Sequence, residues 1–258
     1  MNIPLLLLVL LLGHVLGDFY CQWNYMAAMK KTNGKWLIAH GFVYAVCIAA
    51  ALLILVRFGG VACSRSLLWI FVWVSLSHII IDFFKSRAIW EKLNMAKWLF
   101  SIDQFAHFVF LFLAWYFWGR QLMVGRHIYV YAHHLTVALG LLVLLRPVGL
   151  LLGSGVIWTF SKPEAKHLRK SDIREEAVKQ KKDSSRLIGY LERIIVFFLL
   201  LNGEYSAIAL VIAAKSIARF PEIKDEKGHL RANDYIIGTF LSLTAVIAVT
   251  VLLGLFSN

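Results

Sequence analysis

The stretch Leu12-Gly13-His14-Val15-Leu16-Gly17-Asp18-Phe19 decides the fold, because its pattern returns as Leu76-Ser77-His78-Ile79-Ile80-Ile81-Asp82-Phe83. Both copies read Leu-small-His-x-x-x-Asp-Phe, and both lie within strongly apolar runs. A His and an Asp four positions apart lie on one face of a helix, one turn apart. The two copies therefore predict two helices that each present an imidazole and a carboxylate on the same face.

A second apolar run follows each copy and carries another His near its start. These residues are His40 after the first copy and His107 after the second, with Asp103 one helical turn before His107. The pattern predicts a duplicated helical hairpin, arranged as a parallel internal repeat. Its faces would converge on metal through seven potential ligands, which are His14, Asp18, His40, His78, Asp82, Asp103 and His107.

The composition indicates an all-α, polytopic integral membrane protein. The 258 residues are 60% hydrophobic and 16% charged, whereas a soluble domain has roughly 45–50% apolar and about 25% charged residues. The apolar runs are too long for barrel strands, so helices are expected. We expect about eight transmembrane helices, near residues 4–20, 36–56, 67–84, 99–118, 128–145, 187–201, 204–218 and 235–256.

The same pattern predicts the organisation of the chain. Residues 1–126 would form a four-helix membrane domain that carries the His/Asp site. Residues 127–160 would hold the fifth helix, followed by either a short helical continuation or a re-entrant segment. The charged stretch 161–186 is expected to be a cytoplasmic linker, which could include a surface helix, and it leads to a three-helix membrane region at 187–258.

The net charge of +12 sets the expected orientation. Basic residues gather near 30–35, 85–97, 161–186 and 219–231, while the intervening loops hold few. The positive-inside rule then places both termini outside the cytoplasm and the seven polar residues in one layer at the cytoplasmic edge. The charge fits contact with anionic membrane lipids, and the absence of an aromatic-interleaved basic module argues against a nucleic-acid partner.

The seven side chains suit a divalent metal, with Zn²⁺ as the first choice and Mn²⁺ or Fe²⁺ as alternatives. They exceed the needs of one tetrahedral ion and would serve two or three ions. Two ions about 3.5–4 Å apart clamp the attacking and leaving oxygens in phosphoester cleavage. The leading hypothesis is hydrolysis of a lipid or lipid-linked phosphoester at the cytoplasmic face by a metal-activated water, with Asp18, Asp82 and Asp103 as catalytic carboxylates.

Other interpretations stay open. A lone intramembrane His is more often a packing residue than a ligand, although ionisable groups in membrane segments are costly and mark function by default. The same cluster would also suit a metal-ion or proton transporter, or a structural metal. Lys215 and Arg219, four positions apart in the second half, are candidates for contact with a substrate's lipid phosphate, and an internal ion pair is the alternative.

The two His-x-x-x-Asp motifs, His40 and Asp103-Gln-x-x-His107 resemble an uncharacterised bacterial membrane family of the domain-of-unknown-function type. They also resemble the inner-membrane metal-dependent hydrolases of the LexA-regulated kind. Those hydrolases are similar, more distantly, to zinc-dependent phospholipase C and the zinc single-strand nucleases, which are all-helical enzymes with trinuclear His/Asp sites. The resemblance covers about the first 120 residues, and it implies a bacterial inner-membrane enzyme that uses zinc.

Overall fold

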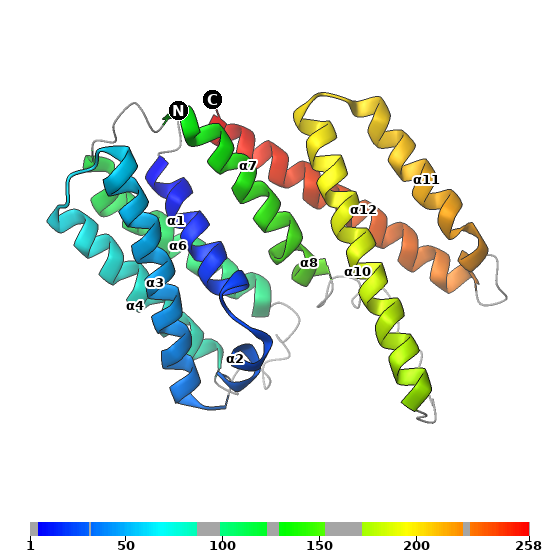
Figure 1. The fold of residues 1–258 in the computed structure, drawn as a ribbon, viewed down its shortest axis with the longest axis horizontal. Helices are drawn as coiled ribbons and strands as arrows, with labels where there is room; N and C mark the ends of the chain where they lie inside the picture. Colours follow the sequence, from blue (N-terminus) through cyan, green and yellow to red (C-terminus); the bar gives the residue numbers. More distant parts are fainter. Residues whose placement is uncertain are drawn as a thin grey trace. The chain divides into compact units, whose positions relative to one another are not determined.

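The computed structural model describes residues 5–30, 32–86, 99–122, 129–152, 172–223 and 228–257. These ranges are helical and hold no strand, as the composition predicts (Figure 1). The elements are α1 (Leu5–Val15), η1 (Leu16–Tyr20), α2 (Asn24–Met29), α3 (Gly34–Gly59), α4 (Arg65–Lys85), α6 (Leu99–Trp118), η2 (Gly119–Gln121), α7 (Tyr129–Leu145), α8 (Pro147–Leu151), α10 (Asp172–Leu201), α11 (Tyr205–Ile223) and α12 (Gly228–Ser257).

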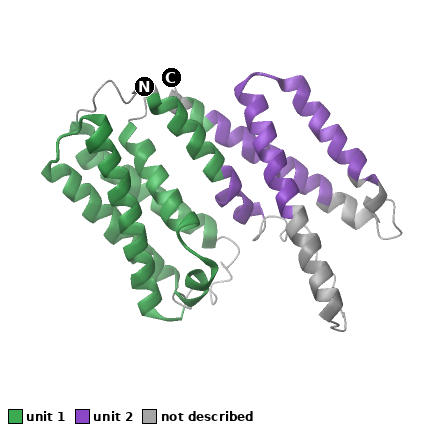
Figure 2. Cartoon of the chain, viewed as in Figure 1, with its two compact units in different colours: residues 1–143, 252–258 green, residues 144–251 purple. Residues whose placement is uncertain are grey.

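The chain divides into two compact units, which Figure 2 shows in different colours. The first comprises residues 1–143 and 252–258, and the second comprises residues 144–251. The domain limits drawn from the sequence stay predictions. The described residues do not include 153–171. The predicted re-entrant segment beyond residue 152 and the first part of the charged linker fall in this range.

Four helices build the core of the first unit. α1 packs against α3 and α6, and α4 packs against α3 and α6, so the four helices close a ring. Glycines bring their backbones close, as small residues do in membrane helix pairs. A Cβ on Gly17 would lie 2.9 Å from Tyr44 Cδ2 on α3, and a Cβ on Gly41 would lie 2.5 Å from Ile79 Cγ1 on α4. These approaches let short His and Asp side chains from different helices meet.

The described helices bury polar groups and turn large apolar groups outward. His40 is 0% exposed on α3, whereas Phe42 on the same helix is 70% exposed. A soluble bundle shows the opposite arrangement, because large exposed apolar patches are unfavourable in water. The outward apolar side chains indicate a lipid environment.

Five of the described helices are long and apolar enough to cross a membrane. They are Gly34–Gly59, Arg65–Lys85, Leu99–Gln121, Tyr131–Leu151 and Tyr235–Gly254. The apolar helices Leu5–Tyr20 and Tyr205–Ala218 are shorter. The predicted eight spans are therefore not confirmed, and the duplicated hairpin and the orientation of the termini stay predictions.

The helix bounds differ from the sequence-based expectation at several places. The first segment does not end as an α-helix, because residues 16–20 form the π-helix η1, closed by a hydrogen bond from Cys21 N to Leu16 O of 2.8 Å. The predicted loop before α3 contains the short helix α2. α10 begins at Asp172, well inside the segment predicted as a linker, because its charged first half is also helical.

In the second unit, α10 and α11 pack side by side (Figure 1). Pro147 separates α7 from α8 and leaves carbonyl groups at the end of α7 in need of donors. Arg193 on α10 supplies one, because its Nε donates to Leu144 O at 2.8 Å. Gly149 leaves room for this guanidinium, since a Cβ there would lie 3.4 Å from Arg193 Nη2.

Candidate metal centre

Four side chains from three helical segments meet inside the first unit. Asp18 comes from η1, His40 from α3, and His78 and Asp82 from α4. One ligand atom from each lies within 4.8 Å of the others, and all four residues are buried. The sequence reasoning predicted that these four would converge, and the fold brings them together.

The spacing of the four side chains matches that of ligands around one small cation. His40 Nε2 lies 3.1 Å from His78 Nε2, and it lies 3.3 Å from both Asp18 Oδ1 and Asp82 Oδ2. A tetrahedral ion with bonds of about 2.0–2.1 Å places its ligand atoms about 3.3 Å apart. A single proton can join only one donor to one acceptor in this group, whereas a cation would satisfy all four atoms.

A second group shares Asp82 with the first. Asp103 and His107 on α6 each place a ligand atom within 4.8 Å of Asp82, and all three residues are buried. Within the described residues, His107 Nε2 and one oxygen each of Asp82 and Asp103 have no hydrogen-bond partner. Buried polar groups are normally paired, and a second cation that shares Asp82 with the first could satisfy these three atoms.

His14, the seventh predicted ligand, lies beside the two groups. Its ring centroid is 5.2 Å from that of His107 and 6.1 Å from that of His78. Its Nδ1 lies 3.2 Å from Tyr44 Oη, and its Nε2 lies 3.3 Å from Gln104 Oε1. Both ring nitrogens of His14 therefore have hydrogen-bond partners, and one of these hydrogen bonds would have to break before His14 could bind an ion.

The π-helix η1 changes the geometry expected of the first motif. In the regular helix α4, His78 Nε2 lies 3.7 Å from Asp82 Oδ2 of the next turn. A π-turn is wider than an α-turn, so residues four apart no longer stack directly. Asp18 instead turns its Oδ1 toward His40 on α3. Single π-turns inside membrane helices are frequent at functional sites.

Polar side chains that the sequence reasoning did not select surround the cluster. Gln104 Nε2 donates to Asp18 Oδ2 and to Asp103 Oδ2, both at 3.1 Å. The ring of Tyr44 stacks on His78, with centroids 3.6 Å apart and planes 3° from parallel. Gln104 follows Asp103 directly, so its place beside a predicted ligand was the available signal. Nothing in the sequence around Tyr44 distinguishes it from a packing aromatic.

Two lysines reach the carboxylates from the edge of the site. Lys30 Nζ donates to Asp82 Oδ2 at 2.7 Å, and Lys85 Nζ donates to Asp103 Oδ2 at 2.5 Å. Their side chains are 10% and 27% exposed, whereas both carboxylates are 1% exposed. The three carboxylates outnumber the two ammonium groups, so the cluster would carry a net negative charge once its imidazoles are deprotonated, as metal binding requires. The position of Lys85, one turn beyond Asp82 on α4, was the signal that could have found it.

The predicted phosphate contacts lie in the other unit. Lys215 forms an ion pair with Glu192 on α10, which agrees with the internal ion pair that the sequence left open. The side chain of Arg219 lies outside the described residues.

The chain was compared with known proteins. No curated protein and no solved structure was found to match it. Residues 6–138 match the family described as "Protein of unknown function (DUF3307)". This range contains all seven His and Asp residues of the site and covers more than half of the chain. The protein belongs to the DUF3307 family.

Proposed function

We propose that this protein is a membrane-embedded, metal-dependent hydrolase that cleaves a phosphoester in a lipid or lipid-linked substrate. One observation carries the proposal: six buried His and Asp side chains form two groups of potential ligands that share Asp82, and Asp82, Asp103 and His107 each keep a buried atom without a hydrogen-bond partner among the described residues. Two neighbouring ions held by shared carboxylates are the arrangement that cleaves phosphoesters in many unrelated folds.

The protein's own residues would divide the work in a defined way. His40, His78, Asp18 and Asp82 would hold one ion, and Asp82, Asp103 and His107 would hold the other. Zn²⁺ suits this nitrogen and oxygen donor set, with Mn²⁺ and Fe²⁺ as alternatives. The ions would supply an activated water and Lewis acidity. A carboxylate oxygen that remains free, on Asp18, Asp82 or Asp103, would accept the proton from that water.

Lys30 and Lys85 support a phosphate-bearing substrate. Each ammonium group contacts a carboxylate of the site and lies nearer to the surface than that carboxylate. If metal ions neutralise Asp82 and Asp103, the two ammonium groups lose their partners and become available to phosphate oxygens. A transferred or leaving phosphate would then meet positive charge on two sides, which stabilises a phosphoryl-transfer transition state.

The test is metal-dependent hydrolysis by the purified full-length protein in detergent. We expect two or more zinc ions per chain and cleavage of a phosphomonoester or phosphodiester lipid. A chelator should abolish this cleavage, and added zinc should restore it. His78→Ala should lose both bound zinc and turnover. Lys35→Met, on an exposed lysine at the start of α3, is the matched control and should retain both. A folded protein that binds no zinc, manganese or iron would overturn the proposal.

A transporter of metal ions is the second candidate, and the π-helix η1 favours it. Transport sites commonly use membrane helices whose backbone departs from α geometry beside the bound ion, and Asp18 lies in the π-helical end of the first apolar segment. We expect zinc uptake into proteoliposomes that Asp82→Asn abolishes if this candidate is correct. Uptake without phosphoester cleavage would replace the hydrolase proposal.

A further inference from the structure

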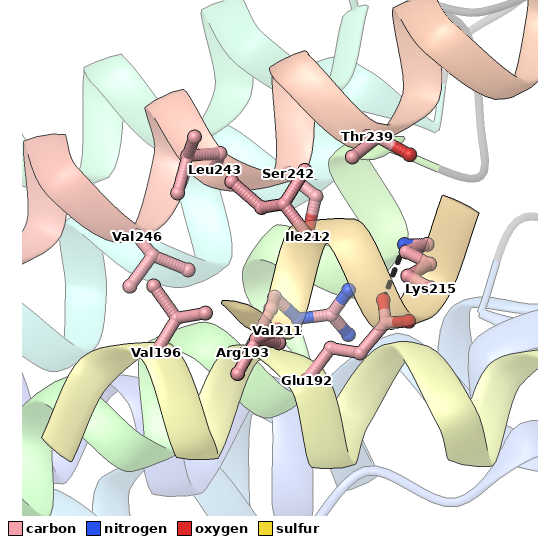
Figure 3. Close-up of a pocket in the computed structure, with 10 residues that line it drawn as sticks. All are labelled: Glu192, Arg193, Val196, Val211, Ile212, Lys215, Thr239, Ser242, Leu243 and Val246. Carbon is pink, nitrogen blue, oxygen red and sulfur yellow. Dashed lines mark hydrogen bonds and ion pairs between the residues drawn. The ribbon is translucent and has the colours of Figure 1, made fainter. Parts of the chain in front are cut away.

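A pocket lies between α10, α11 and α12 in the second unit (Figure 3). None of the residues that line it belongs to the candidate metal centre. The pocket is small, with a cavity volume of about 30 Å³, and it is partly open to the surroundings. Its polar lining residues are Glu192, Arg193, Lys215, Thr239 and Ser242. Thr239 and Ser242 lie in the candidate membrane span Tyr235–Gly254, where polar groups are expensive to keep.

The charges in this pocket do not balance. Lys215 pairs with Glu192, as the dashed line in Figure 3 marks. Arg193 is 6% exposed and always charged. Its Nε bonds to Leu144 O, and its guanidinium lies 5.1 Å from the ring centre of Tyr190. Among the described lining residues, no second carboxylate is available to Arg193. A buried positive charge without a counter-ion is costly, so an anion from outside the chain would stabilise the pocket.

Unpaired hydroxyl groups at the same end of the pocket support an anion. Thr239 Oγ1 lines the pocket and is buried, and it has no hydrogen-bond partner among the described residues. The Tyr235 hydroxyl, one turn earlier on α12, is in the same state. The ring of Tyr235 lies 5.9 Å from Lys215 Nζ, which places both residues at one end of the pocket. Hydroxyl groups can donate to an oxyanion, and burial without a partner leaves these two free to do so.

The opposite end of the pocket is apolar. Val196 follows Glu192 and Arg193 by about one turn on α10, and Leu243 and Val246 follow Thr239 on α12. Figure 3 shows Val196, Val246 and Leu243 gathered away from Lys215 and Thr239. Thr239 and Val246 both lie in the candidate membrane span Tyr235–Gly254. The pocket therefore changes from charged to apolar along the span, so an anion would bind at the end that carries Lys215, beside the lipid-facing side chains of this span.

We infer that this pocket binds one anionic phospholipid, with a phosphate oxygen between Lys215, Arg193 and Thr239 and the acyl chains outside the pocket, along the lipid-facing helices. The pocket has room for little more than this oxygen, and Val196 and Val246 are only 6% and 1% exposed, so they close its inner end. The site needs no metal and no hydrolysis, so it is independent of the function proposed above.

Two variants separate this lipid site from a structural ion pair. Lys215→Met removes the cation that would contact the phosphate and leaves Glu192 to repel it. Glu192→Gln removes the competing carboxylate and frees Lys215. A lipid site therefore predicts opposite effects on lipid binding, whereas a structural ion pair predicts that both variants only lower the thermal midpoint. Thr239→Val replaces the unpaired hydroxyl by a methyl of similar size, so it should weaken lipid binding without unfolding the protein.

The measurement is native mass spectrometry of the full-length protein, titrated with phosphatidylglycerol or phosphatidylcholine, with Lys35→Met as the matched control. Charge-assisted hydrogen bonds to phosphate predict that Lys215→Met weakens phosphatidylglycerol binding by about tenfold or more. Glu192→Gln should strengthen it, and phosphatidylcholine should bind weakly to every form. Equal retention of both lipids, or equal effects of Lys215→Met and Glu192→Gln, would overturn the inference. Displacement of phosphatidylglycerol by millimolar inorganic phosphate would also overturn it, in favour of a free phosphate ion.

Discussion

Replacement of Gly41 by alanine tests whether close helix approach sets the metal centre. An added Cβ would lie 2.5 Å from Ile79 Cγ1 and 2.7 Å from Ile79 Cδ1, whereas ordinary contacts begin at 3.4 Å. Relief of this overlap requires α3 and α4 to separate by about 0.9 Å or Ile79 to leave its rotamer, and overpacking of this kind costs about 1–3 kcal/mol. The alanine returns about 0.5–1 kcal/mol through its helix propensity. We therefore expect a net loss of about 1–2 kcal/mol in the free energy of unfolding.

The effect on the metal centre should exceed the effect on stability. His40 adjoins Gly41, and His40 Nε2 lies 3.1 Å from His78 Nε2 across the same helix pair. A separation of 0.9 Å, fully transmitted, would open that distance to about 4.0 Å, well beyond the edge of about 3.3 Å in a tetrahedral site. Metal sites tolerate deviations of only about 0.2 Å in each bond. Loss of correct ligand geometry typically lowers metal affinity by 10–100-fold, which we take as the expected range.

The assay is competition for zinc between the purified protein and a chelator, together with thermal unfolding. Gly34→Ala is the matched control on the same helix, because a Cβ there meets nothing within 4 Å, so zinc affinity should not change. The double variant Gly41→Ala with Ile79→Ala removes the overlapping atoms and should recover most of the zinc affinity. Unchanged zinc affinity in Gly41→Ala, measured on a folded protein, would refute the argument that helix approach creates the site.

Three further outcomes follow from the metal centre. Asp82→Asn should remove more than one zinc ion per chain, because Asp82 belongs to both ligand groups. A zinc analysis that shows loss of a single ion would exclude a bridging role for Asp82. Lys30→Met should retain zinc or bind it more tightly, because the ammonium group of Lys30 contacts Asp82 Oδ2. The same variant should raise the KM for a phosphoester lipid. An unchanged KM would show that Lys30 does not bind the substrate. Lowering the pH of a zinc titration should weaken binding steeply, because the imidazoles must be neutral to bind metal, and a flat profile between pH 5 and pH 8 would contradict His ligation.

The helices that carry the site follow closely from the sequence, because long apolar runs bounded by polar residues leave few alternatives. α6 has the predicted limits, and α3 and α4 extend the predictions by one to three residues at each end. The π-helix η1 could not be predicted, because it depends on how Asp18 meets α3 rather than on local propensity. The charged composition of 161–186 predicts a linker and allows a surface helix within it, but it does not indicate that this helix continues into the apolar part of α10.

The candidate site could be predicted only in part, for a related reason. Residues such as His78 and Asp82 stand out because an ionisable side chain in an apolar run is unusual. Lys85 and Lys30 come from segments where lysine is common, so only the folded geometry reveals their contacts with the carboxylates. Tyr44 looks like any membrane aromatic until its ring is found stacked on His78. The role of each residue as a ligand stays a prediction until metal is measured.

The irregular turn at residues 16–20 makes the two His-x-x-x-Asp motifs unequal. A π-turn is equivalent to one residue inserted into an α-helix. Each residue turns a regular α-helix by about 100°, whereas the wider π-turn advances by less per residue. The same four-residue spacing therefore directs Asp18 and Asp82 differently relative to their histidines. Transplanting the sequence of the second motif into the first helix would therefore preserve every side chain of the pattern and still misdirect the carboxylate.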